Sequence, residues 1–234
     1  MIEIRRVAAR AGAFQLTDIS FDIPANAYGV IVGAAGCGKT TLLEVIAGVH
    51  PLSEGQVMLN ARDATQMPPE QRAIGLVYQR GALFPHRSVE ENIGWSGTNG
   101  DATQDIVERL AIAPLFKTPV SRLSGGERQL VALARALVRV RACLNRGEAP
   151  ALLLDEPFSA LDPRRRLATR ETVHYFHTEW KLTTLQVTHD GTDARRADVA
   201  VLMDAGRIVQ SGAPAEMLRA PVRDDVGLFL QGAV

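Results

Sequence analysis

Cysteine and net charge are both scarce in this chain of 234 residues. Cys37 and Cys143 are its only cysteines, so they cannot form the multi-disulfide framework of a small secreted domain, and no paired CxxC units indicate a metal site. Twenty-six basic residues balance 26 acidic ones, which gives a formal net charge of zero. The strongly basic surface of a nucleic-acid-binding protein is therefore not visible at the level of the whole chain, and we expect no nucleic-acid partner.

Long apolar runs are also missing. The longest stretch without Asp, Glu, Lys or Arg runs from Ile23 to Gly38 and contains Pro24 and several glycines. A membrane-spanning helix needs about 20 mostly apolar residues, so this stretch is too short and too interrupted. The N-terminal residues MIEIRRVAAR lack the apolar core of a signal peptide. We expect a soluble, cytoplasmic protein whose membrane role, if it has one, depends on a partner.

Short apolar runs alternate with helical periods along the chain, which predicts an α/β fold with a mostly parallel sheet. Ser124 and Glu127 fit a capping box, and apolar residues follow at spacings of three and four. The pattern predicts helices over 40–47, 103–110, from 124 onward and over 163–181, and strands over 21–23, 28–32, 55–60, 74–78, 151–154, 185–188, 200–203 and 208–210. The most loop-like segment is 94–100.

A glycine-rich loop follows the predicted strand 28–32. Its residues match the phosphate-binding pattern G-x-x-x-x-G-K-[ST] and lead into a helix that also contains Thr41; they are Gly33, Ala34, Ala35, Gly36, Cys37, Gly38, Lys39 and Thr40. Backbone N–H groups and the helix N-terminus would surround phosphates, Lys39 would reach the β- and γ-phosphates, and Thr40 would bind magnesium. The alternative is a glycine turn with an exposed lysine. Cys37 is either an activated thiol or, as we favour, a small residue whose N–H faces phosphate.

Polar residues follow several predicted strands, where α/β sheets bind ligands. Asp155 would hold magnesium through water and Glu156 would polarise an attacking water, as phosphoryl transfer requires; the alternative is a solvated acidic turn. Gln79 is either a magnesium or water ligand or a polar edge residue. His189 either bonds the γ-phosphate or is structural.

The segment Leu123–Gln129 reads LSGGERQ. With the phosphate loop before it and Asp155 and Glu156 after it, the chain resembles the ATP-binding subunit of ABC transporters. The resemblance places Gln79 in the Q-loop, Ser159 to Asp162 in the D-loop and His189 as the switch histidine. It implies a phosphate-loop NTPase core, an N-terminal antiparallel β subdomain and a helical signature subdomain over about 82–140, within one domain over 1–234.

The resemblance also implies a mechanism with ATP and Mg²⁺ as cofactors. Two copies would pair head to tail, and each ATP would lie between the phosphate loop of one copy and the signature residues of the other: Ser124, Gly125, Gly126 and Glu127. Asp162 would connect the two sites, Glu156 would act as base, and His189 would link γ-phosphate and water. Thr40, Gln79 and Asp155 would hold the metal.

Leu83 to Asn92 is similar to the LFPH-x-x-V-x-x-N stretch of bacterial importers that handle oxyanions (molybdate, tungstate or sulfate), polyamines, iron(III) or sugars. This implies two transmembrane permease subunits that contact the region 81–91, an extracytoplasmic substrate-binding protein, and a place on the cytoplasmic face of the inner membrane. Leu83 and Phe84 are either core residues or, as we favour, part of that interface. We favour an oxyanion such as molybdate as cargo. The alternatives are a soluble ABC-type ATPase, for example in iron–sulfur-cluster assembly, and an ATP-binding module without turnover, which the presence of Glu156 and His189 disfavours.

The chain departs from the family pattern in three places. The early loop 8–13, where the family has an aromatic residue for adenine, contains Arg10 but no aromatic, and Phe14 is the nearest. The segment 138–149 is longer than the family's usual connection into the strand 151–154, and we expect it to bulge at the surface. We also expect no C-terminal β-rich regulatory domain. The run Arg164 to Arg166 is either a nucleic-acid patch or, as we favour, a solvated helix face.

Overall fold

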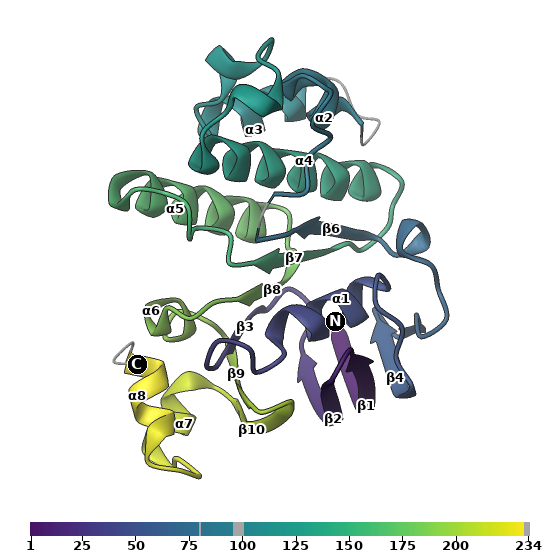
Figure 1. Cartoon of the computed structure of the whole chain (residues 1–234), viewed down its shortest axis with the longest axis vertical. Coiled ribbons are helices and arrows are strands. Elements are labelled where there is room, and N and C mark those ends of the chain that lie inside the picture. Colours follow the sequence, from purple (N-terminus) through teal and green to yellow (C-terminus); the bar gives the residue numbers. More distant parts are fainter. Residues whose placement is uncertain (80, 96–100, 232–234) are drawn as a thin grey trace. The chain divides into compact units, whose positions relative to one another are not determined.

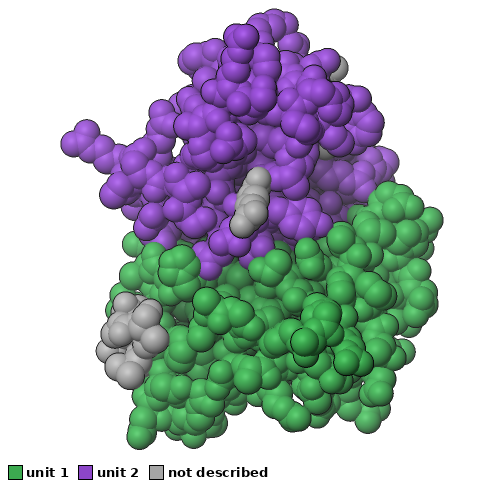
Figure 2. Space-filling model, viewed as in Figure 1, with its two compact units in different colours: residues 1–72, 182–234 green, residues 73–181 purple. Residues whose placement is uncertain are grey.

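The computed structural model describes residues 1–79, 81–95 and 101–231 (Figure 1). These residues form two compact units (Figure 2). The first unit contains Met1–Arg72 together with the C-terminal part of the chain from Leu182, and the second unit contains Ala73–Lys181. Within the described ranges, no helix is both long enough and apolar enough to cross a membrane.

The N-terminal sheet of the first unit is antiparallel. Its strands lie in the order β2-β1-β4-β5, with bounds β1 Ile2–Ala11, β2 Phe14–Ile23, β4 Glu54–Leu59 and β5 Arg62–Asp63. Buried and exposed residues alternate at the end of β2, where Phe21 and Ile23 are buried and Asp22 is exposed, as expected for a strand with one covered face. The predicted antiparallel N-terminal sheet is confirmed. The strand predicted over 21–23 is the end of a much longer one.

The other strands of the first unit surround β3 (Tyr28–Val32), in which every residue is buried. It pairs in parallel with β8 (Thr183–Val187) and with β9 (Val199–Asp204), and β9 pairs antiparallel with β10 (Arg207–Gly212). Buried β-branched and apolar residues on both faces are typical of a parallel sheet. The prediction of an α/β fold with a mostly parallel core is confirmed.

Helices of the first unit follow its strands (Figure 1). Their bounds are α1 Lys39–Ala47, α6 Gly191–Ala194, α7 Pro214–Arg219 and α8 Asp225–Gln231, with a short 3₁₀ turn, η1, at Pro69–Gln71. Helix α1 ends at Gly48, whose backbone is left-handed, as is common for a residue that terminates a helix. The predicted helix over 40–47 is therefore confirmed to within one residue.

The second unit packs helices against a parallel strand pair, β6 (Ile74–Val77) and β7 (Ala151–Asp155). Its helices are α2 Val89–Gly94, α3 Asp101–Arg109, α4 Gly125–Asn145 and α5 Pro163–Glu179, with 3₁₀ turns at η2 Ala113–Leu115 and η3 Val120–Arg122. Gly75 lets α4 approach β6 closely, because a Cβ there would lie 2.5 Å from the carbonyl oxygen of Ala136. The strand pair and the helix that carries the signature residues are thus held together tightly.

The prediction for 138–149 is wrong over most of that segment. Helix α4 continues to Asn145, and Val138, Val140 and Cys143 are fully or almost fully buried. These apolar residues continue the helical spacing, so burial against the rest of the second unit extends the helix. Only the exposed turn Arg146–Ala149 leads from it to β7. Of the segment predicted as a loop over 94–100, Gly94 ends α2, and 96–100 lie outside the described residues.

Candidate nucleotide site

The phosphate loop leaves the buried end of β3 and enters α1. Gly33 has φ of 153°, and a Cβ there would lie 2.2 Å from the carbonyl oxygen of Met203, so no other residue fits. The loop also contacts the turn between β9 and β10, because the N–H of Gly206 donates to the carbonyl of Cys37 at 3.1 Å. The glycine pattern found in the sequence therefore reflects a close backbone approach in the first unit.

Lys39 lies inside this loop. Its side chain is only 8% exposed, and its Nζ donates to the carbonyl oxygens of Gly33 at 2.7 Å and Ala34 at 2.9 Å. A buried ammonium needs such partners, since an unpaired buried charge is costly. The alternative of an exposed lysine on a glycine turn is wrong. The loop holds a positive charge next to the N-terminus of α1, which favours an anion such as a phosphate group.

Cys37 is also buried in the loop, with its Sγ 3.8 Å from Nζ of Lys39. Burial raises the pKa of the Cys37 thiol and outweighs the opposing effect of the nearby ammonium. A thiol with a raised pKa is protonated and weakly nucleophilic. This favours the interpretation of Cys37 as a small residue in the loop. Of the two threonines that follow Lys39, Thr40 is exposed and Thr41 is half-buried.

His189 lies at the same edge of the first unit's sheet as the loop. Strands β3 and β8 are parallel neighbours, and the N–H of Thr188 donates to the carbonyl of Ile31 at 3.1 Å. The carboxyl ends of both strands therefore open at one edge, where the phosphate loop follows β3 and His189 follows β8. The side chain of His189 is exposed. The first unit thus places His189 at the same edge of its sheet as the phosphate loop that contains Lys39 and Thr40.

Asp155 and Glu156 lie at the corresponding edge of β6 and β7 in the second unit. Asp155 is the last residue of β7 and is 2% exposed. Gln79 comes shortly after β6, whose Val77 pairs with Leu154, so Gln79 follows the neighbouring strand at the same edge. This edge presents an amide and two acids, which are oxygen ligands of the type that magnesium prefers.

The backbone of Glu156 is left-handed, with φ of 47°. Non-glycine residues in this region are strained and are common at functional sites. Two side chains hold the strained carbonyl: Gln129 donates through Nε2 at 3.0 Å and Ser159 donates through Oγ at 3.0 Å. Gln129 is buried on α4, and no local pattern in the sequence links it to Glu156. The sequence alone therefore does not reveal its role.

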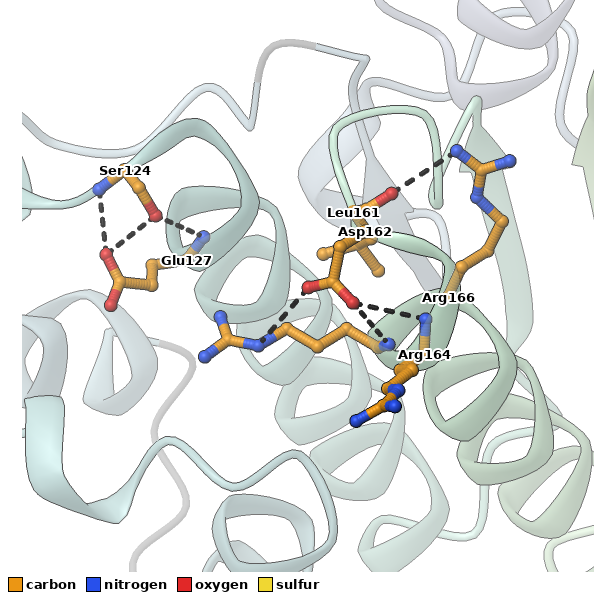
Figure 3. A network of polar contacts seen from close by, with 7 residues as sticks. Ser124, Glu127, Leu161, Asp162, Arg164 and Arg166 are labelled. Carbon is orange, nitrogen blue, oxygen red and sulfur yellow. Dashed lines mark hydrogen bonds and ion pairs between the residues drawn. The ribbon is translucent and has the colours of Figure 1, made fainter.

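The predicted capping box at the start of α4 is confirmed. Figure 3 shows Ser124 and Glu127 joined by several hydrogen bonds: the N–H of Glu127 donates to Oγ of Ser124 at 3.3 Å, and Oε2 of Glu127 accepts from N and Oγ of Ser124 at 2.8 and 2.7 Å. These hydrogen bonds lower the pKa of Glu127. Gly126 lies close to the D-loop, since a Cβ there would be 3.1 Å from the carbonyl oxygen of Ala160.

Asp162 begins α5. Its Oδ1 accepts from the backbone N–H groups of Arg164 and Arg165, both at 3.1 Å (Figure 3). It therefore acts as the helix N-cap in the second unit. The side chains of Arg164 and Arg165 are exposed, as expected for a solvated helix face, whereas Arg166 donates to the carbonyl of Leu161 at 3.2 Å.

The residues present fit a nucleoside triphosphate with magnesium. The first unit supplies a backbone loop too narrow for a Cβ at Gly33 and a buried ammonium at Lys39, both suited to phosphate oxygens. The second unit supplies the buried carboxylate of Asp155 and the strained Glu156. Each unit by itself therefore contains residue types that phosphoryl-transfer enzymes use.

Comparison with known proteins agrees with this site. The family model described as "ABC transporter" matches residues 16–159, which contain the phosphate loop, the signature residues and both strand-end acids.

The chain belongs to the ABC transporter family.

Several members of the family that are similar to this chain are named as import ATP-binding proteins. The iron(III) import protein of Pseudomonas fluorescens is 43% identical over 95% of this chain and 64% of its own length. The sn-glycerol-3-phosphate import protein of Rhizobium johnstonii is 36% identical, over 98% and 63%. The sulfate/thiosulfate import protein of Bordetella parapertussis is 37% identical, over 98% and 66%. The chain spans about two thirds of the length of these relatives.

Solved structures confirm the fold. A dimeric ATP-binding cassette bound to ADP and phosphate superposes with a TM-score of 0.79 at 22% identity, covering 91% of this chain and 98% of its own. A bacterial Atm1-family ABC exporter with ATP bound gives 0.83 at 24% identity, covering 99% and 41%. At these identities the likeness establishes the ABC cassette fold of the chain.

Proposed function

We propose that this chain is the ATP-hydrolysing, energy-coupling subunit of an ABC importer. The observation that carries the proposal is the ammonium of Lys39, which is buried in a glycine loop and donates hydrogen bonds there to the backbone carbonyls of Gly33 and Ala34. Phosphate oxygens are stronger acceptors than carbonyls for an ammonium. Bound ATP would therefore draw Lys39 from these two carbonyls to its β- and γ-phosphates.

The remaining site residues have complementary roles in this proposal. Mg²⁺ held by Thr40, Gln79 and Asp155 would neutralise charge on the phosphates. Glu156 would orient the attacking water and accept its proton. The hydrogen bonds from Gln129 and Ser159 to its carbonyl hold its left-handed backbone, and this backbone sets the starting point of the carboxylate side chain. His189, at the edge of the sheet that carries the phosphate loop, would hydrogen-bond the γ-phosphate.

We further propose that two copies pair to complete each site. The N-terminus of α4 offers N–H groups and a helix dipole to the nucleotide of the partner copy, with Ser124, Gly125, Gly126 and Glu127 at the contact. Asp162 fixes the start of α5 next to this contact within the second unit. The two units would act as one ATP-binding domain over 1–234.

Support for the importer role comes from the relatives and from the segment Leu83–Trp95. Here Phe84 and Trp95 rings lie 5.0 Å apart, and the guanidinium of Arg87 lies 4.3 Å from the Trp95 ring centroid. Trp95 is 59% exposed, so the aromatic and cationic cluster faces solvent in the single chain. An exposed aromatic beside arginine is typical of a protein interface. We propose that this cluster contacts the permease.

The complete transporter would have two permease subunits and an extracytoplasmic substrate-binding protein, with this chain peripheral to the cytoplasmic face of the membrane. The relatives are named for cargoes as different as iron(III), sulfate and glycerol phosphate. Molybdate stays a prediction.

Replacing Glu156 by Gln tests the enzymatic part. This variant should bind ATP, form a stable dimer and lose turnover, because the amide cannot accept the water proton. Glu54→Gln, an exposed change on β4, is the matched control and should hydrolyse ATP at the wild-type rate. Wild-type turnover in the Glu156→Gln variant would contradict the role of Glu156.

Purification from membranes tests the importer part. Recovery of the chain with a membrane-embedded partner supports an importer. Loss of that partner in Trp95→Ala would show that the cluster of Phe84, Arg87 and Trp95 contacts the permease. Recovery with soluble scaffold proteins alone would favour the alternative of a soluble ABC-type ATPase.

A further inference from the structure

A chain of three polar side chains crosses the interior of the first unit. Gln186, in the middle of β8, is 1% exposed. Its Oε1 accepts from Oη of Tyr28 on β3 at 2.5 Å, and its Nε2 donates to Oδ2 of Asp193 on α6 at 2.7 Å. One buried amide therefore joins a sheet strand to a helix.

Packing alone does not require these residue types. Every residue of β8 is buried, and an apolar side chain of similar volume would fill the space of Gln186. A buried amide is tolerated only when its donor and its acceptor both have partners, and here both do. Hydrogen bonds are directional, so this chain fixes the position of α6 relative to β3 and β8 more narrowly than apolar contacts would.

Helix α6 begins two residues after His189, and hydrogen bonds hold the backbone on both sides of that histidine. Before it, the N–H of Thr188 donates to Ile31 on β3. After it, the N–H of Asp190 donates to Oγ1 of Thr188 at 3.0 Å, and the N–H of Asp193 donates to the carbonyl of Asp190 at 3.1 Å. The bond from Gln186 to Asp193 completes the second anchor.

We propose that Asp193, held by Gln186 and Tyr28, is a positioning residue for His189. This inference rests on the proposed function, in which His189 meets the γ-phosphate. Because the side chain of His189 is exposed, its direction depends on where its backbone is held. Tyr28 is the first residue of β3, the strand that leads into the phosphate loop. The hydrogen bonds through Tyr28, Gln186 and Asp193 therefore fix the position of His189 relative to that loop.

Two substitutions at Asp193 separate positioning from a simple charge effect. Asp193→Ala removes the acceptor, whereas Asp193→Asn keeps an amide oxygen for Gln186 but loses the charge in the first turn of α6. A displacement of about 1 Å in a catalytic group costs up to about 100-fold in rate, so we expect Asp193→Ala to lower kcat about 10-fold or more. KM for ATP should stay within about twofold, because the phosphate loop is untouched.

Asp193→Asn should keep most of the wild-type kcat. The control Asp22→Ala, an exposed acid on β2 in the same unit, should behave as wild type. The double variant Tyr28→Phe with Gln186→Leu replaces the hydrogen-bonded side chains by apolar ones of similar size, so it should fold. Its kcat should fall as much as that of Asp193→Ala.

NMR of the histidine ring gives a readout that needs no turnover. The ring signals of His189 should shift or broaden in Asp193→Ala and in the double variant, and should match wild type in Asp193→Asn. If wild-type protein does not hydrolyse ATP, the proposed function fails while the NMR comparison still tests the positioning. Unchanged His189 signals with wild-type kcat in Asp193→Ala, or equal losses in Asn and Ala, would overturn the inference.

Discussion

The guanidinium of Arg72 donates a 2.6 Å hydrogen bond from Nη1 to the carbonyl oxygen of Ile46, near the end of α1. The same group also donates to the carbonyls of Val45, Met67 and Thr65, and Arg72 is 2% exposed. A positive charge at a helix C-terminus complements the helix dipole, and Arg72 does this for the helix whose N-terminus follows the phosphate loop.

Arg72→Met should therefore destabilise the protein. Hydrogen bonds from a charged donor contribute about 1.5–3 kcal/mol each, and the variant removes the four that Arg72 donates, so we expect a loss of about 3 kcal/mol or more. Urea unfolding measures it. Arg72→Lys should fall between, because an ammonium cannot reach all four carbonyls. Arg62→Met, at an exposed position of β5, should change stability by less than about 0.5 kcal/mol.

Lys39→Ala should weaken ATP binding. The ammonium lies in the loop that we propose binds the phosphates, and a charge-assisted hydrogen bond of about 1.5–3 kcal/mol corresponds to about 10- to 100-fold in Kd. Isothermal titration with ATP provides the measurement. Lys117→Ala removes a lysine whose side chain is 86% exposed and forms an ion pair with Glu90, and it should leave binding unchanged. Equal affinities of the two variants would exclude the role of Lys39.

Gln129→Leu should remove one of the two side-chain donors that hold the strained carbonyl of Glu156. We expect a loss of stability of about 1–3 kcal/mol, since a buried acceptor loses a partner. ATP turnover should fall with it, because the position of the Glu156 carboxylate depends on this backbone. Gln104→Ala on the exposed face of α3 is the control for both measurements. A Gln129→Leu protein with wild-type turnover would show that Ser159 alone holds Glu156 in place.

The two capping boxes should contribute to acid sensitivity. Hydrogen bonds from Ser124 lower the pKa of Glu127, and those from Ser88 lower the pKa of Glu91. Because both folded-state pKa values lie below the unfolded value of about 4.3, this stabilisation is present above that pH and is lost as pH falls through the folded values.

The variant Glu91→Gln with Glu127→Gln should therefore show a shallower fall in the free energy of unfolding below about pH 4.3. Unfolding in urea across this range measures the slope. Ser124→Ala removes the hydroxyl that donates to Glu127 and should flatten the same limb to a smaller degree. An acid limb identical to wild type in the double Gln variant would refute the assignment.

The sequence by itself determined the features that depend on neighbouring residues. The glycine loop, the capping box of Ser124 and Glu127, and the apolar strands before Gly33 and after Ala149 follow local rules of backbone freedom, hydrogen bonding and periodicity. The box formed by Ser88 and Glu91 follows the same rule and was identifiable from its spacing. The α/β fold follows because these local elements recur in alternation.

Only the tertiary structure decided which distant residues support the site. Arg72, Gln129 and the chain of Tyr28, Gln186 and Asp193 act across separations that no local pattern encodes. Tertiary burial also made residues 138–145 a helix, because Val138, Val140 and Cys143 are covered in the second unit. A polar group's partner is set by the folded geometry, because the cost of leaving that group unpaired arises only once the fold has removed it from water.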